Sequence, residues 1–261
     1  MPTDYKVRSV IADDSLDTSA IELQNVSVRF RLPVERVSTV KEYAIRWFQR
    51  RLEYRDLWAL HDVSFQVGKG EIFGVVGVNG AGKTTLLKVI ARVLHPTEGR
   101  VRVAGTVAPI LELGGGFHPE LTGRENVYLY GSLLGWTRNE LDEGFGEIVE
   151  FAELWDFIDA PLRTYSSGMT ARLAFAVATA KFADVILVDE VLAVGDIQFQ
   201  EKCLDRIELY RRKGSTIVVV SHNPALITRM CERAIWLSNG KLLALDSAED
   251  VTEQYESEHS T

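Results

Sequence analysis

The chain has 261 residues, of which 46% are hydrophobic, and this is enough to bury the core of one large or two small domains. A formal net charge of −8 argues against a nucleic-acid-binding surface as the main function, so no nucleic-acid partner is expected. Residues 1–20 are polar and acidic, unlike a signal or transit peptide, and no apolar run reaches the roughly 18 residues that predict a membrane span. The two cysteines, Cys203 and Cys231, lack metal-type spacing, which predicts reduced thiols.

The N-terminal part predicts a flexible segment over 1–20 and two strands separated by an insert. Apolar and polar residues alternate over Ile21–Phe30, and a second strand is expected over Ala59–Val67. The insert, 31–58, contains a helix capping box followed by apolar residues at helical spacing, which predicts an amphipathic helix at 39–53. Two interpretations stay open: a surface helix packed on its own domain, or a helix at the membrane–cytosol boundary, to which its Trp, Tyr and Arg residues are suited.

A glycine-rich loop then follows a buried strand and opens a helix. The loop Gly77–Thr84 (GVNGAGKT) comes after the apolar run Ile72–Val76, and the helix is expected to reach about Leu94. This order is what a phosphate-binding loop requires, because backbone N–H groups and the helix N-terminus together attract an anion. A lysine reaches the terminal phosphates, and a hydroxyl after it binds magnesium. The predicted nucleotide-binding residues here are Gly77, Asn79, Gly80, Ala81, Gly82, Lys83, Thr84 and Thr85.

The middle of the chain changes from strands to helices. Strands are expected over Arg100–Ala104 and Thr106–Leu111, followed by a hinge-like loop over Leu113–Pro119. A helical subdomain is predicted at about 118–182, with helices over Gly123–Leu134, Thr137–Leu154 and Thr170–Phe182. Within it, Tyr165–Met169 begins with serines ahead of a helical run. That segment is either an ordinary N-cap or an anion site aimed at a second phosphate group.

Two later strands end in polar side chains that suit phosphate chemistry. The strand Val185–Val188 is followed by Asp189 and Glu190, of which the first suits a magnesium shell and the second can polarise an attacking water. The strand Thr216–Val220 leads to His222, either a structural histidine or a contact to the γ-phosphate. Parallel α/β sheets collect ligands at the carboxyl ends of their strands, so these side chains are expected to meet.

The C-terminal part completes an α/β pattern. Helices are expected over Ile197–Lys213 and Pro224–Cys231, and an Asn-Gly turn joins the strands Ala234–Leu237 and Leu242–Leu245. The acidic tail, 247–261, is expected to be a short exposed helix. The predicted fold class is α/β: a P-loop NTPase core at 21–246 with an antiparallel β part and a helical subdomain.

The phosphate loop, the Tyr165–Met169 segment, Asp189-Glu190 and His222, in this order and spacing, resemble the nucleotide-binding subunit of an ABC transporter. The resemblance covers nearly everything from Ile21 to Leu245. It implies that Gly77–Thr84 is Walker A, Val185–Asp189 is Walker B, Glu190 is the catalytic carboxylate and His222 the switch histidine. It further implies a D-loop that ends at Asp196 and an adenine-stacking aromatic at Phe30, for which Tyr54 and Trp58 are competitors.

Three departures from the common pattern narrow the resemblance. The signature reads Tyr-Ser-Ser-Gly-Met in place of Leu-Ser-Gly-Gly-Gln, and Glu112 and Leu113 stand where the Q-loop glutamine belongs. The insert is the third departure. With these features the chain is similar to exporters of lipid-linked polysaccharide, namely O-antigen, teichoic acid, capsule or galactan. In that comparison the insert corresponds to a gate helix beside the permease.

The resemblance implies ATP and Mg2+ as cofactors, with Thr84 and Asp189 as metal ligands, and hydrolysis of ATP to ADP and phosphate. It implies a homodimer in which each ATP lies between Walker A of one chain and Ser166, Ser167 and Gly168 of the other. The resemblance also implies two permease subunits and a lipid-linked glycan substrate as partners. It implies a peripheral position on the cytoplasmic face of the inner membrane. An ABC ATPase for another substrate is the nearest alternative. A soluble ABC-type ATPase would be expected to show a long coiled coil, tandem halves or a basic face.

Overall fold

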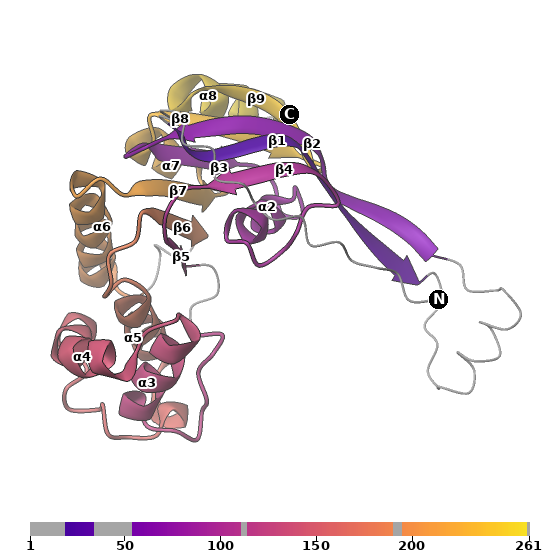
Figure 1. Ribbon diagram of the computed structural model, residues 1–261. Coiled ribbons are helices and arrows are strands. Elements are labelled where there is room, and N and C mark those ends of the chain that lie inside the picture. The colour runs from indigo at the N-terminus through magenta and orange to yellow at the C-terminus, as the bar shows by residue number, and fades with distance from the viewer. Residues whose placement is uncertain (1–18, 34–53, 111–113, 190–194, 260–261) are drawn as a thin grey trace, which may run out of the picture.

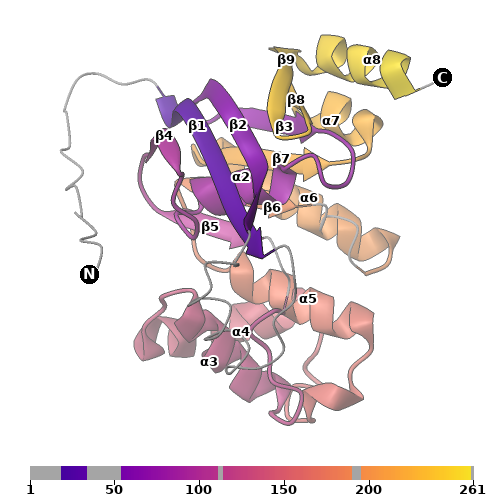
Figure 2. The same cartoon turned by 90° about the vertical axis from the view of Figure 1, so that its right-hand side faces the viewer.

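A computed structural model describes residues 19–33, 54–110, 114–189 and 195–259 of the chain. It contains a six-stranded sheet, a three-stranded sheet and a lobe of helices below them (Figures 1 and 2). The larger sheet has the strand order β5-β6-β7-β3-β8-β9. The strands are Val107–Ile110 (β5), Val185–Asp189 (β6), Thr216–Ser221 (β7), Ile72–Val76 (β3), Arg233–Ser238 (β8) and Lys241–Ser247 (β9).

The larger sheet is parallel except for its last strand. The pairs β5–β6, β6–β7, β7–β3 and β3–β8 are parallel, whereas β9 pairs antiparallel with β8 through the predicted Asn239-Gly240 turn. The strands β3, β6 and β7 are nearly all buried, as expected for a sheet covered on both faces. Their carboxyl ends therefore lie at one edge of the sheet, where the predicted phosphate-binding residues follow them.

The smaller sheet is antiparallel, with the strand order β2-β1-β4. Its strands are Tyr54–Gly68 (β2), Ser19–Pro33 (β1) and Glu98–Val103 (β4). Together with helix α2 (Lys83–Ile90), it packs on one face of the larger sheet and encloses a core that includes Leu86, Phe73 and Val218. The strands β1 and β2 remain paired as far as Pro33 and Tyr54, so the hairpin extends into the predicted insert at both ends.

The other face of the larger sheet is covered by helices. The lobe visible at the bottom of Figure 1 contains α3 (Gly123–Leu133), α4 (Arg138–Ala152) and α5 (Ser167–Ala178). Its core is continuous with that of the sheet, through buried residues such as Phe151, Phe175 and Phe199. The remaining helices are α6 (Ile197–Arg212), α7 (Pro224–Met230) and α8 (Ala248–His259), and a short 3-10 helix, η1, spans Leu162–Thr164.

The C-terminal tail differs from the prediction. It is helical, but the expectation of an exposed helix was wrong, because Val251 is fully buried and Tyr255 only 8% exposed. The Tyr255 ring meets Trp236 of β8 edge-on, with 6.0 Å between the ring centroids. Apolar residues recur four positions apart, at Val251 and Tyr255, on one face of an otherwise acidic helix, and that face covers the sheet.

Burial also decides the state of both cysteines. Cys203 and Cys231 are free and buried, and loss of solvation raises the pKa of each thiol to about 12. Cys203 lies on the buried face of α6, and Cys231 lies at the end of α7. Both thiols are therefore protonated at neutral pH and pack as small apolar groups. That neither forms a disulfide agrees with the reduced thiols that the sequence predicted.

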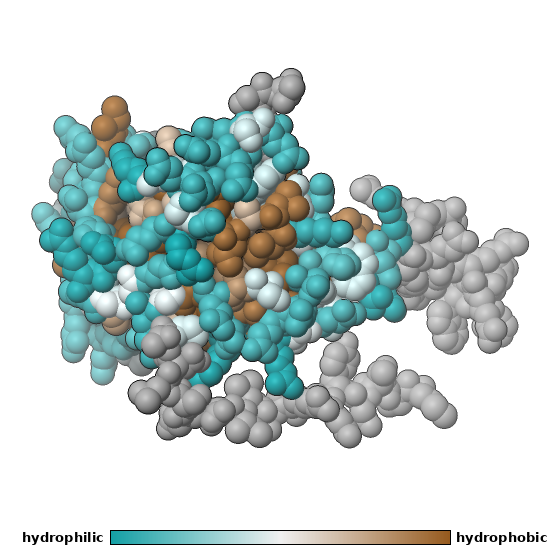
Figure 3. Space-filling model, turned by 90° about the horizontal axis from the view of Figure 1, so that it is seen from above, coloured by the Kyte–Doolittle hydropathy of each residue, from teal (hydrophilic) through white to brown (hydrophobic). Residues whose placement is uncertain are grey.

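Seen from above, the surface is mostly hydrophilic, with apolar areas bordered by hydrophilic side chains (Figure 3). On β9, Leu243 and Leu245 are 51% and 37% exposed. None of the helices within the described ranges combines the length and the apolar character needed to cross a membrane.

Candidate functional site

The glycine-rich loop joins β3 to α2, as predicted. Gly82 is the N-cap of α2 with φ 107, and no side chain caps that helix end. A Cβ atom at Gly77 would lie 2.3 Å from the Leu237 carbonyl oxygen, and one at Gly82 would lie 2.4 Å from that of Ala59. Only glycine fits these two positions, because backbone from β8 and β2 closes on the loop. The uncapped helix N-terminus at the end of such a loop is an anion-binding arrangement.

The turn between β8 and β9 supports this loop from outside. Gly240 donates its N–H to the Ala81 carbonyl at 2.9 Å, and its own carbonyl accepts from His61 of β2 at 2.8 Å. Asn239 and Gly240 both have positive φ, as a tight hairpin turn requires. The sequence predicted this hairpin but not its contact with the loop, since nothing in either segment encodes their separation in space.

The lysine and the hydroxyl of the loop both have hydrogen-bond partners in the structure. Lys83 is 6% exposed, and its Nζ donates to the carbonyls of Gly77 and Val78 at 2.8 and 3.1 Å, so the ammonium lies within its own loop. The Thr84 hydroxyl donates to Asp189 Oδ2 at 3.2 Å. A hydroxyl and a carboxylate at this separation suit Mg2+, which is held by a few protein oxygens and completes its shell with waters and phosphate oxygens.

The strand register explains how distant residues meet at this edge. Asp189 pairs with Val220 across β6 and β7, and Val76 pairs with Ser221 across β3 and β7. The ends of three parallel strands are thus level with the start of the loop. His222 follows β7 and is exposed at the same edge. Asn79, Gly80 and Thr84 are exposed there, and Thr85 and Gly82 are half-buried.

The Tyr165–Met169 segment forms the start of α5 in the helical lobe. Ser166 is the N-cap, and its Oγ accepts from Met169 N at 3.1 Å. The helix begins at Ser167, earlier than predicted, because this cap satisfies one of its first N–H groups. Ser166 and Ser167 are exposed, and Gly168 is half-buried. Both open interpretations are therefore compatible with the local geometry: a capped helix start that also faces solvent.

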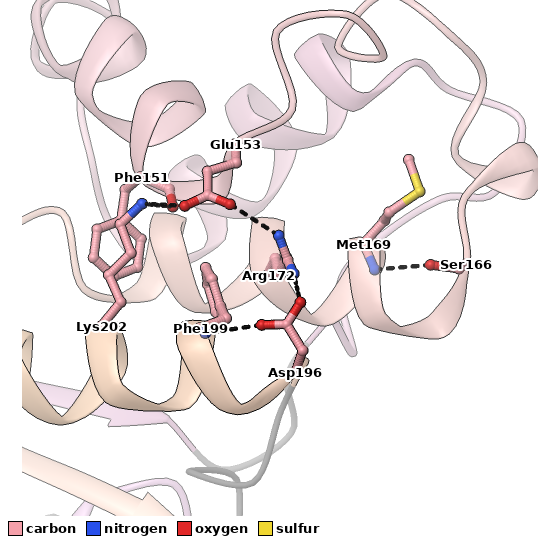
Figure 4. A network of polar contacts seen from close by, with 8 residues as sticks. All are labelled: Phe151, Glu153, Ser166, Met169, Arg172, Asp196, Phe199 and Lys202. Carbon is pink, nitrogen blue, oxygen red and sulfur yellow. Dashed lines mark hydrogen bonds and ion pairs between the residues drawn. The ribbon is translucent and has the colours of Figure 1, made fainter.

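Asp196 has a defined structural position. It is the N-cap of α6, where its Oδ1 accepts from Phe199 N at 2.9 Å, and its Oδ2 accepts from Arg172 of α5 (Figure 4). In the sequence, only the family resemblance singles out Asp196. Its pairing with Arg172 was not predicted, because the two residues belong to helices separated by a strand.

The candidate adenine-stacking residues lie on the β1–β2 hairpin. Phe30 is 38% exposed and pairs with Leu57 across the strands. Trp58 pairs with Arg29, whose guanidinium lies 5.4 Å from its ring centroid, and the His61 ring lies 5.6 Å away. The Tyr54 backbone pairs with Pro33, but its side chain lies outside the described residues, as do Glu190, Glu112 and the predicted helix 39–53.

One structural residue was missed entirely by the sequence analysis. Asn126 is fully buried, and its side-chain oxygen accepts from His118 N at 2.7 Å. Its Nδ2 lies 2.8–3.1 Å from three carbonyl oxygens, those of His118, Leu121 and Thr122. A buried amide with this many partners fixes the loop before α3. The only signal was an Asn three residues into a predicted helix, where that residue type is uncommon.

Residues 60–193 match the ABC transporter family. The O-antigen export system ATP-binding protein RfbB of Klebsiella pneumoniae is 47% identical over 238 residues, which cover 90% of this chain and 96% of that protein. RfbB of Myxococcus xanthus is 41% identical, over 93% of this chain and 56% of its own length. The teichoic acids export ATP-binding protein TagH of Shouchella clausii is 38% identical over 90% of this chain and 64% of its own length.

Solved structures agree on the fold. An ATP-binding cassette described as dimeric, in a post-hydrolysis state with ADP and Pi, superposes with a TM-score of 0.69 at 24% identity, over 87% of this chain and 98% of that one. The ATP-binding subunit of an ABC transporter superposes with a TM-score of 0.70 at 22% identity, over 91% and 93%. The predicted α/β fold class and family are confirmed: this chain belongs to the ABC transporter family and is an ATP-binding cassette ATPase.

Proposed function

We propose that this chain is the ATPase subunit of an exporter that moves lipid-linked polysaccharide across the cytoplasmic membrane. The observation that carries the proposal is the 47% identity over 96% of the length of an O-antigen export ATP-binding protein. The teichoic acid relative supports the same class of substrate, a polymer on a lipid carrier, without selecting the sugar. In this proposal the subunit is peripheral on the cytoplasmic face, bound to two permease subunits.

Within one chain, the loop after β3 holds the triphosphate and its metal. The backbone N–H groups from Gly77 to Thr85 and the ammonium of Lys83 bind the β- and γ-phosphates. Thr84 and Asp189 would hold Mg2+, which would supply positive charge to offset the negative charge of the phosphate oxygens. Phe30 stacks on adenine in preference to Trp58, because Arg29 and His61 already lie against the Trp58 ring. Glu190 polarises the attacking water, and His222 contacts the γ-phosphate.

A second copy of the chain completes the site in this proposal. Ser166, Ser167 and Gly168 begin a helix whose N-terminus attracts anions, and both serines are exposed. Bound to the γ-phosphate of the partner's ATP, they close a head-to-tail dimer with two nucleotides. Hydrolysis removes the charge that both faces bind, so the dimer weakens once ADP and phosphate remain.

A groove between the core and the helical lobe is the proposed contact for a cytoplasmic helix of the permease. It has a volume of about 520 Å3, and its lining includes Pro109 of β5, Leu133, Trp136 and Phe182. Leu133 and Phe182 are 65% and 43% exposed. Aromatic and aliphatic side chains around a cleft suit the apolar face of a helix. Because β5 leads directly to the predicted Q-loop at Glu112, a permease helix that moves in this groove would displace the Q-loop beside the nucleotide site.

The test uses the chain together with its permease in lipid vesicles. Glu190→Gln should abolish hydrolysis while ATP binding remains, since the amide cannot polarise water but leaves the phosphate contacts intact. Lipid-linked glycan should be exported by the parent complex and not by the Glu190→Gln complex. Ser257→Ala, on the exposed part of α8, is the control and should match the parent. Near-normal hydrolysis by Glu190→Gln would contradict the assignment of Glu190, and export of a different substrate class would contradict the proposed cargo.

A further inference from the structure

A polar network joins three helices of the structure at the point where the predicted D-loop ends (Figure 4). Arg172 of α5 donates through Nη1 to Glu153 at 3.1 Å and through Nη2 to Asp196. Lys202 of α6 donates to the other oxygen of Glu153 at 2.8 Å and to the Phe151 carbonyl at 2.9 Å. The Arg172 guanidinium therefore connects Glu153, the C-cap of α4, to Asp196, the N-cap of α6.

Both carboxylate oxygens of Asp196 are used inside the chain. Oδ1 caps α6 through Phe199 N, and Oδ2 accepts from Arg172. The chain at Gly195 lies close to both α5 and α6. A Cβ atom at Gly195 would lie 3.2 Å from Phe199 Cβ and 3.4 Å from Arg172 Nε. The orientation of the chain that enters α6 is consequently set by Arg172 and the cap together.

Arg172 also belongs to the helix that presents the signature serines. Ser166 caps α5, and Arg172 lies six residues later, about 9 Å along the helix axis at 1.5 Å per residue. Its guanidinium lies 4.9 Å from the Phe199 ring centroid, and its side chain is 20% exposed. The two carboxylates are 56% and 60% exposed. Solvent screens the two carboxylates, and a single guanidinium spans two helices, an arrangement that favours a role in orientation.

We propose that Arg172 is a positioning residue that holds Asp196 and the start of α5 as one unit, so that the signature serines and the D-loop reach the partner's nucleotide together. This inference rests on the proposed ATP-driven dimer. Arg172 contacts neither the Walker A loop nor, in this proposal, any nucleotide. Its loss should therefore weaken dimer formation while nucleotide binding by the single chain is retained.

The chain offers a matched control. Arg206 of α6 lies 4.2 Å from the Phe151 ring centroid, pairs with Glu147 at 3.1 Å and is 12% exposed, and within the described residues its ion pair is with Glu147 and not with Asp196. Arg172→Gln and Arg206→Gln each remove one guanidinium and keep part of the alkyl stem. Both variants are made in the Glu190→Gln chain, which retains ATP. Melting temperature, ATP affinity of dilute monomer, and the dimer dissociation constant by sedimentation are measured for each.

For Arg172→Gln we expect an ATP affinity within about twofold of the parent and a dimer dissociation constant raised about tenfold. Arg206→Gln should lower the melting temperature about as much as Arg172→Gln does. It should leave the dimer dissociation constant within about twofold of the parent value. Equal effects of the two variants on the dimer would overturn the inference, as would parent-like dimerisation of Arg172→Gln. If the Glu190→Gln parent itself stays monomeric with ATP and Mg2+, the proposed dimer fails and the inference fails with it.

A second substitution tests the connection to Asp196 directly. Asp196→Asn keeps an N-cap of similar quality and loses the ionic contact with Arg172. Its effect on the dimer constant should match that of Arg172→Gln, and the double variant should be no worse than either single one. Additive effects would overturn the inference, because they would mean that the two side chains act independently.

Discussion

The buried amide of Asn126 shows how one side chain fixes the loop that precedes α3. Its side-chain oxygen accepts from His118 N, and its NH2 group shares two hydrogens among three nearby carbonyl oxygens, so the amide holds the segment from His118 to Thr122 against α3. That segment is in turn bonded to the chain before the signature, since Leu162 N donates to Leu121 O and Arg163 N to Pro119 O. The loop after the predicted Q-loop and the approach to Ser166 are therefore parts of one rigid region.

Asn126→Ala should lower the free energy of unfolding by on the order of 3 kcal/mol, because several buried backbone groups lose their partner at once. Urea unfolding followed by circular dichroism measures the change. Gln254→Ala, which removes an exposed amide from α8, should change the same quantity by less than about 0.5 kcal/mol. A loss for Asn126→Ala no larger than that of Gln254→Ala would contradict this account of the loop.

Among the helices and strands, the residues at each helix end or turn determine where that element begins and ends. They do not determine which other elements it packs against. Thr122 and Thr137 form capping boxes with Glu125 and Glu140, which begin α3 and α4 where the sequence predicted. The helix α2 ends at Ile90, before the predicted Leu94, because Arg92 adopts a left-handed conformation with φ 60. The acidic helix α8 is instead held in place by its contact with β8 and α7, which its composition gave no reason to expect.

Tyr255→Ala should therefore destabilise the whole fold by about 3 kcal/mol, through the lost ring contact with Trp236 and the cavity left beneath α8. Thermal unfolding and the fluorescence of the tryptophans report this change. Glu253→Ala on the exposed face of the same helix is the control and should be nearly neutral. Equal melting temperatures for the two variants would mean that α8 contributes nothing to the core. That result would support the sequence-based prediction of an exposed tail.

For the molecule as a whole, ion pairs on the helical surface couple stability to pH. Hydrogen bonds from Lys181, and from Thr137, lower the pKa of Glu140 to about 2, and Arg211 and Arg212 do the same for Glu208. Both carboxylates have an ordinary pKa of 4.5. A folded-state pKa below the unfolded one means that the stabilisation is present above the unfolded value and is lost as protons bind the native state.

The free energy of unfolding should accordingly fall as the pH is lowered from about 4.5 towards about 2, the window between the unfolded and folded pKa values. Urea midpoints across this range measure the slope. Glu140→Gln and Glu208→Gln should each flatten this slope, because each removes a carboxylate that is ion-paired in the folded state. Glu249→Gln should leave the slope unchanged, because Glu249 forms no ion pair within the part of the chain that the structure describes. Equal slopes for all three variants would contradict the role of these pairs.

The sequence by itself determined the features that are local along the chain. The strand β3, the glycine-rich loop and the helix α2 are consecutive, so their order alone predicted a phosphate-binding loop and, with the later motifs, the family. The caps of the helices and the Asn239-Gly240 turn were readable for the same reason. Each depends on residues within a few positions of one another, where spacing and backbone preference act directly.

Only the tertiary structure decided which distant segments meet. The parallel register of β6, β7 and β3 places Asp189 beside Thr84. The packing of the other elements places the β8–β9 turn against the glycine-rich loop and Arg172 against Asp196. It also buried Tyr255 on an acidic helix. These contacts arise from the way the sheets and helices pack to fill one core, and packing is a property of the whole chain that no local periodicity encodes.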